Sequence, residues 1–97
     1  MTKTDVKTLL IASGKRAIVG NISPAVRAIA IGIKDDQILQ IKCYLDAIPN
    51  VSDYERLSDI SAEILGDIDL NATEEICEYD IRPIAELDQL FGFIYVK

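Results

Sequence analysis

The acidic and sulfur-containing side chains are the residues of this sequence that could do chemistry. Adjacent carboxylates occur at Asp35-Asp36 and Glu74-Glu75, and such pairs can act as general acid and base when their surroundings separate their pKa values. Both pairs fall at a predicted turn or strand start, where carboxylates are normally just solvated. The sequence has no histidine, which excludes histidine-based proton shuttles and nucleophile activation. We therefore predict no catalytic residues and a protein that is not an enzyme.

The two cysteines, Cys43 and Cys77, lie inside strand-like segments. Without histidine they do not form a zinc signature, and no carboxylate spacing matches a calcium loop. The glycines are too dispersed for a phosphate-binding loop. We predict no metal and no cofactor, and we expect both cysteines to be small core residues, with a disulfide or a reactive thiol as the alternatives.

The charge balance points toward a protein partner. Sixteen acidic and ten basic residues (Asp+Glu 16, Lys+Arg 10) give a formal net charge of −6. A negative field repels a phosphate backbone, so direct nucleic-acid binding is disfavoured, while association with a basic protein is accelerated. Solubility alone is the competing explanation of the acidity.

The composition also indicates one folded domain spanning residues 1–97. The apolar fraction is 49% and the charged fraction 27%, which separates the chain from disordered sequences. No apolar run approaches the ~20 residues that span a bilayer, and an acid appears before any signal-like apolar segment. We expect a cytoplasmic protein without a membrane partner.

The elements that must position these side chains follow from hydrophobic periodicity. We predict an α+β domain in αββαββ order, a four-stranded, mainly antiparallel sheet with two helices packed on it. The expected elements are a helix over about 4–18, strands over 25–34 and 37–46, a helix from Ser52, and strands over 74–82 and 91–96. The first two strands should form an antiparallel hairpin, and Ser52 with Glu55 has the capping-box spacing that starts a helix. The predicted inner face of the first helix is Val6, Leu9, Leu10, Ser13 and Ala17.

A row of like charges marks the second predicted helix. The predicted apolar arc of this helix consists of Tyr54, Leu57, Ile60, Ser61, Ile64, Leu65 and Ile68. Asp59, Glu63 and Asp67 recur at four-residue intervals outside this arc, and like charges at this spacing repel by a few tenths of a kcal/mol per pair. Such a row is either a solvated face or a stripe that meets a basic partner. The candidate partner-binding residues are the acids of this helix and of the strand after it: Asp53, Glu55, Asp59, Glu63, Asp67, Glu74, Glu75, Glu78 and Asp80.

Short motifs along the chain resemble a bacterial family. They are Gly20–Ala28 (GNISPAVRA), Asp53–Glu55, Asp59-Ile60, Glu63-Ile64, Tyr79-Asp80 and Tyr95–Lys97. In these segments the sequence is similar to the immunity proteins of contact-dependent growth inhibition (CDI) systems. The resemblance implies a cytoplasmic protein that binds and blocks the C-terminal toxin domain of a delivered effector, commonly an RNase or DNase with a basic cleft. Asp53, Glu55, Asp59, Glu63 and Asp80 are the acids at matching positions.

Two other interpretations stay open at this stage. The chain could be a small acidic adaptor or homodimeric structural protein without a toxin partner, pairing through the last strand at an uncovered sheet edge. A small enzyme using carboxylates alone would instead need a pocket that holds an acid of raised pKa.

Overall fold

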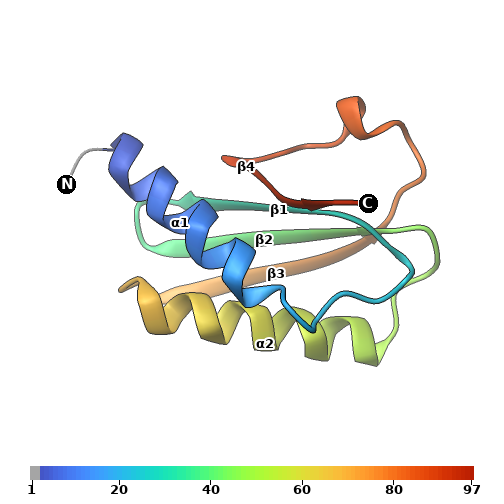
Figure 1. The fold of residues 1–97 in the computed structure, drawn as a ribbon, viewed down its shortest axis with the longest axis horizontal. Helices are drawn as coiled ribbons and strands as arrows, with labels where there is room; N and C mark the ends of the chain where they lie inside the picture. Colours follow the sequence, from blue (N-terminus) through green and yellow to red (C-terminus); the bar gives the residue numbers. More distant parts are fainter. Residues whose placement is uncertain (1–2) are drawn as a thin grey trace.

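The computed structural model describes residues 3–97, with side chains from residue 5 onward. Within that range it confirms the α+β class and the αββαββ order (Figure 1). The elements are α1 (Lys3–Ala17), β1 (Val26–Lys34), β2 (Ile38–Leu45), α2 (Val51–Asp67), β3 (Ala72–Tyr79), the 3-10 helix η1 (Ile84–Glu86) and β4 (Gly92–Val96). No helix in the described part of the chain is long and apolar enough to cross a bilayer.

The strands of residues 3–97 form a four-stranded sheet in the order β3-β2-β1-β4. β1 pairs antiparallel with both β2 and β4, which confirms the hairpin and the mainly antiparallel sheet. β3 pairs with β2 in parallel. The helix α2 carries the chain back along the sheet between these two strands, as a parallel connection requires. β3 and β4 are therefore the edge strands.

Both described helices cover the same face of the sheet, and the main core lies between them and it. The fully buried side chains of this core include Leu10 from α1, Leu57, Ile60 and Ile64 from α2, and Ile29, Ile31, Leu39, Ile41 and Leu45 from the sheet. Every second residue of β1 and β2 contributes to this core, because successive side chains of a strand point to opposite faces of the sheet. This layer fixes the outer side of α2 as a solvent-facing surface.

The prediction that α1 buries one face is confirmed for Leu10, Ser13 and Ala17, which are buried. It is wrong for Leu9, whose side chain is 48% exposed. The reason is the close approach of α1 to β4. A Cβ atom on Gly14 would lie 2.7 Å from Cγ2 of Ile94. Contact at this glycine turns α1 so that Leu9 reaches only the rim of the core.

The opposite face of the sheet is covered by the segment between β3 and β4. Leu87 packs there on Ala28, Ala30 and Tyr44, and the Tyr44 hydroxyl donates to the Asp88 carbonyl at 2.8 Å. Burial raises the pKa of the Tyr44 hydroxyl. The 80–91 segment thus closes a second, smaller core.

Two predicted boundaries are corrected by specific hydrogen bonds. The capping box of α2 is formed by Asn50 and Asp53, whose side chains each accept from the other's backbone N–H at 3.0 and 2.9 Å, so the helix begins at Val51 rather than at Ser52. The strand β3 ends at Tyr79 rather than near residue 82. Asp80 there turns its carboxylate back onto the Arg82 backbone N–H.

Candidate functional site

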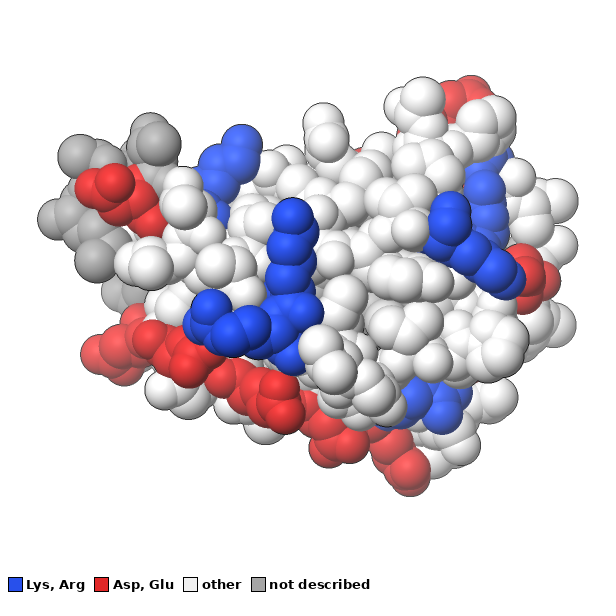
Figure 2. Space-filling view, viewed as in Figure 1, with Lys and Arg blue, Asp and Glu red and all other residues white. Residues whose placement is uncertain are grey.

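Three carboxylates on the outer surface of α2 form what we call the α2 acidic stripe: Glu55, Asp59 and Glu63. All three side chains are exposed, and within residues 5–97 none has a hydrogen-bond or ion-pair partner. At four-residue spacing each acid lies about 40° further around the helix. Figure 2 shows the acidic side chains along the lower edge of the molecule, where Figure 1 places α2. The stripe is an unneutralised negative surface.

Asp53, the first acid predicted for this surface, lies inside the fold. It is 8% exposed and closes the capping box with Asn50. Its carboxylate also forms an ion pair with the Arg56 guanidinium at 3.1 Å. This arrangement satisfies backbone donors at the start of α2. Its carboxylate therefore holds the helix in place, and a contact between Asp53 and a partner stays a prediction.

Asp67, at the other end of α2, joins the two helices. Its carboxylate accepts from the Ser13 hydroxyl at 2.7 Å and from Arg16 at 3.1 Å. The hydrogen bond from Ser13 has the larger effect, and together with the bond from Arg16 it lowers the pKa of the Asp67 carboxyl below its ordinary value. Ser13 is a polar residue on the buried side of α1, and Asp67 explains its presence there.

The acids of β3 divide between the two faces of the sheet. Glu75 faces α2 and accepts from Ser58 at 2.8 Å. Glu74 and Glu78 lie on the other face. There Glu74 pairs with Lys34 at 3.6 Å and Glu78 with Lys42 at 3.9 Å. The structure therefore does not bring all the predicted acids into one patch.

Asp80 anchors the start of the 80–91 segment. Its carboxylate is 9% exposed and meets the Arg82 guanidinium, with the shortest contact at 2.6 Å. The side-chain bonds from Arg82, followed by its backbone N–H, lower the pKa of Asp80 to about 2. Arg27 donates to the carbonyl oxygens of Asp80 and Arg82 at 2.6 and 2.7 Å. This cluster holds the chain as it crosses the sheet edge.

Exposed aromatic side chains beside α2 were not among the predicted site residues. Tyr54 is 44% exposed and its hydroxyl donates to the Cys77 carbonyl at 3.4 Å, and Tyr79 is 50% exposed. Tyrosines with an exposed ring are common at the centres of protein interfaces. Tyr54 lies on the side of α2 that faces β3, and Tyr79 is the last residue of β3. Asp67, by contrast, lies on the side of α2 that faces α1. The sequence pattern placed Tyr54 in the apolar arc, so its exposure could not be predicted.

The cysteines occupy matching positions on neighbouring strands. Cys43 of β2 is the register partner of Cys77 in β3, and both are buried and free. The hydrogen bond to Cys77 and burial raise the pKa of the Cys43 thiol. A raised pKa disfavours the reactive thiolate of Cys43, and the burial of both residues makes them small core side chains.

Hydrogen bonds from their partners lower the pKa values of the Asp67 and Asp80 carboxyl groups, so both groups are held in the charged form. In the described part of the chain, no cluster of three or more His, Cys, Asp or Glu residues could hold a metal ion. An acidic α+β domain with an unpaired carboxylate stripe is instead suited to recognising a basic partner.

Comparison with known proteins agrees with this class. The family model described as MafI2 immunity protein matches residues 7–97. The chain therefore belongs to the MafI2 immunity protein family. It is an immunity protein that neutralises a cognate toxin of the MafB family, and it acts as a non-enzymatic inhibitor. No curated protein matches the sequence in a direct search.

Proposed function

We propose that the chain neutralises its toxin by docking the α2 acidic stripe onto a basic surface of the toxin domain. The observation that carries this proposal is that Glu55, Asp59 and Glu63 are exposed and have no partner within residues 5–97. A toxin that acts as an RNase or DNase must grip phosphates with lysine and arginine. An acidic helix can cover such a surface, and its field speeds the encounter.

The cellular setting proposed from the sequence resemblance fits this mechanism. We place the protein in the cytoplasm, where a delivered nuclease would meet its nucleic-acid substrate, and we propose a contact-dependent system as the delivery route. Direct binding of nucleic acid by the immunity protein is disfavoured by its net charge of −6. The basic toxin domain is therefore its partner in this proposal.

Charge reversal tests the proposal in solution and in cells. The variant Asp59→Lys with Glu63→Lys replaces two exposed acids, and we expect it to bind the cognate toxin domain about 10- to 100-fold more weakly. Growth of cells that express this toxin domain should then no longer be rescued. Glu86→Lys is the matched control, because Glu86 is an exposed acid on η1, across the sheet.

Circular dichroism must show that the double variant is folded before its affinity is interpreted. An affinity equal to that of the wild type in a folded double variant would refute the assignment of the stripe. Failure of the wild-type chain to bind or to rescue would refute the proposed function as a whole.

The homodimer considered from the sequence stays a proposal for the oligomeric state of this immunity protein, and one observation bears on it. β4 lies at an edge of the sheet, where it pairs with β1, so its outer backbone is positioned to pair with another strand. Sedimentation of the purified protein separates monomer from dimer. A dimer that persists in the presence of toxin would favour pairing through β4.

A further inference from the structure

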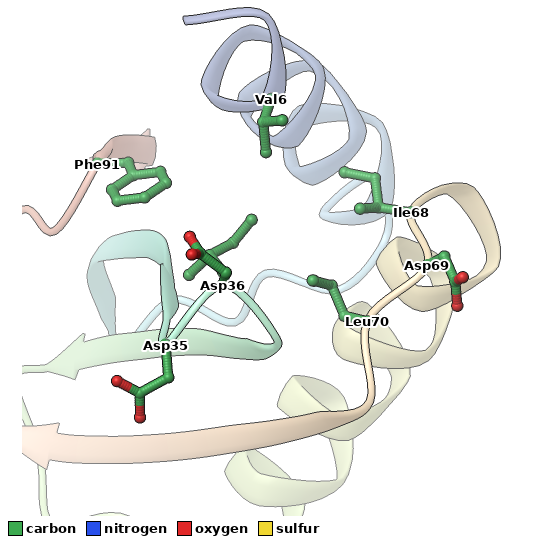
Figure 3. A pocket seen from close by; sticks show the side chains of 8 residues that line it. Val6, Asp35, Asp36, Ile68, Asp69, Leu70 and Phe91 are labelled. Atoms are coloured by element: carbon green, nitrogen blue, oxygen red, sulfur yellow. The ribbon is translucent and has the colours of Figure 1, made fainter. Parts of the chain in front are cut away.

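A cavity of about 630 Å³ lies at the end of the molecule where the β1–β2 turn, the end of α2 and the start of α1 meet (Figure 3). This volume is within the range of small-ligand pockets, roughly 300–1,000 Å³. Its walls are mainly apolar side chains, with carboxylates around them. The lining residues are Val6, Ile33, Asp35, Asp36, Ile68, Asp69, Leu70 and Phe91.

The carboxylates of the cavity do not all point the same way. Figure 3 shows the Asp36 side chain turned toward the Phe91 ring and the hollow, whereas Asp35 and Asp69 point away from it. Among the described residues that line the cavity none is basic. Lys34, next to the turn, is paired with Glu74 at 3.6 Å. The cavity therefore combines apolar walls with negative charge that none of its described lining residues neutralises.

The conformation of the turn accommodates the Asp36 side chain but does not require its charge. Asp35 and Asp36 have φ angles of 54° and 60°, and the Gln37 backbone N–H donates to the Lys34 carbonyl at 3.2 Å. Turns with two such residues favour asparagine at the first position and glycine at the second. A glycine at Asp36 would relieve the backbone, and asparagine tolerates this conformation as aspartate does. The turn therefore leaves the charge of Asp36 free to meet a ligand.

We propose that this cavity receives an arginine side chain of the toxin domain. The aliphatic stem of arginine would contact Val6 and Leu70, and its guanidinium would meet the Asp36 carboxylate beside the Phe91 ring. Phe91 is an apolar residue that is 37% exposed, so a cation can reach the ring. A purely apolar side chain would leave the Asp36 charge desolvated and unpaired, which is costly.

The position of the cavity links it to the α2 acidic stripe. α2 ends at Asp67, and the next residue, Ile68, is already part of the cavity wall. One partner surface can therefore cover the stripe and enter the cavity. The inference rests on the proposed function and assigns to the same partner a specific anchoring side chain.

Two variants with matched controls test this site in calorimetric titrations with the cognate toxin domain. Asp36→Asn removes the charge and keeps the shape, and asparagine suits the positive φ angle, so the variant should fold at least as well as the wild type. Its exposed control is Glu86→Gln. Val6→Trp fills the cavity from α1, and its control is Val19→Trp, since Val19 is 79% exposed beyond the other end of α1.

We expect Asp36→Asn and Val6→Trp each to weaken toxin binding at least tenfold, while both controls bind within about twofold of the wild type. Thermal unfolding of each variant checks that it is folded. If the wild type binds the toxin domain and Asp36→Asn binds it equally well, the proposed contact between Asp36 and a toxin arginine is refuted, while the proposed function stands. If the wild type does not bind at all, the proposed function fails and this inference fails with it.

Variants of the toxin domain identify the anchor. One arginine should lose at least tenfold in affinity when changed to alanine or to lysine, because lysine lacks the planar two-pronged donor. Combined with Asp36→Asn, the same change should cost little more than either change alone, as expected of two groups that interact. If every arginine variant adds its full effect to that of Asp36→Asn, the proposal is overturned.

Discussion

Removing the charges of the α2 acidic stripe should stabilise the fold and weaken toxin binding at the same time. The triple variant Glu55→Gln, Asp59→Asn and Glu63→Gln keeps the side-chain shapes. It eliminates two contacts between unpaired like charges at four-residue spacing, and a weaker third one between Glu63 and Asp67, whose charge Arg16 partly offsets. Each such contact destabilises a helix by about 0.2–0.5 kcal/mol, so the free energy of unfolding should rise by about 1 kcal/mol.

The helix dipole adds little to this value. Glu63 lies four residues before the C-terminal end of α2, where an acid is unfavourable, and Glu55 lies four residues after its N-terminal end, where an acid is favourable. Removing both charges therefore changes two small terms of opposite sign. For a domain of this size, about 1 kcal/mol corresponds to a rise in Tm of about 4–8 °C.

Thermal unfolding and calorimetric binding to the toxin domain measure the two effects on the same protein samples. We expect the triple variant to melt higher and to bind at least tenfold more weakly. The control Glu86→Gln, on the other side of the sheet, should change neither property. A triple variant that melts lower would refute the reasoning on stability, and unchanged affinity would refute the role of the stripe.

Further predictions concern the residues that hold the fold. The pKa of Asp80 is lowered to about 2 from roughly 3.9 in an unfolded chain, so its contribution is complete above the unfolded value and is lost as pH falls toward 2; Asp80→Asn should flatten the acid limb of a pH-dependent unfolding curve. Gly14→Ala should lower the unfolding free energy by about 1–2 kcal/mol in chemical denaturation, because its Cβ would lie 2.7 Å from Ile94, and a gain in stability would contradict the close helix contact. Cys43 and Cys77 are 4% and 7% exposed, so both should react with a thiol reagent much more slowly in the native protein than in guanidinium, and equal rates would show that the core is open.

The element order could be predicted because the apolar pattern changes period clearly between helices and strands. The parallel pairing of β3 with β2 could not, since alternation within a strand does not specify its neighbour. The prediction that Ser52 and Glu55 form the capping box was wrong for a related reason. Asn50 with Asp53 and Ser52 with Glu55 have the same three-residue spacing, and only the tertiary position of the preceding loop decides between them.

The acids of the site were predictable as residues but not in their roles. Periodicity placed Asp59 and Glu63 outside the apolar arc, and the structure leaves both exposed. Asp67 follows the same spacing, yet it bonds to Ser13, which lies more than fifty positions earlier in the chain. The cavity lies beyond prediction for the same reason, because its walls come from segments that only the fold brings together.

The most direct test of the binding mode is an amide NMR titration of the labelled chain with the unlabelled toxin domain. We predict the largest shift changes and line broadening in α2, from about residue 52 to residue 70, and in the turn at 35–37. The amides of residues 80–88, on the other side of the sheet, should remain unchanged. Changes confined to that segment or to β4, with α2 unaffected, would contradict binding through the α2 acidic stripe.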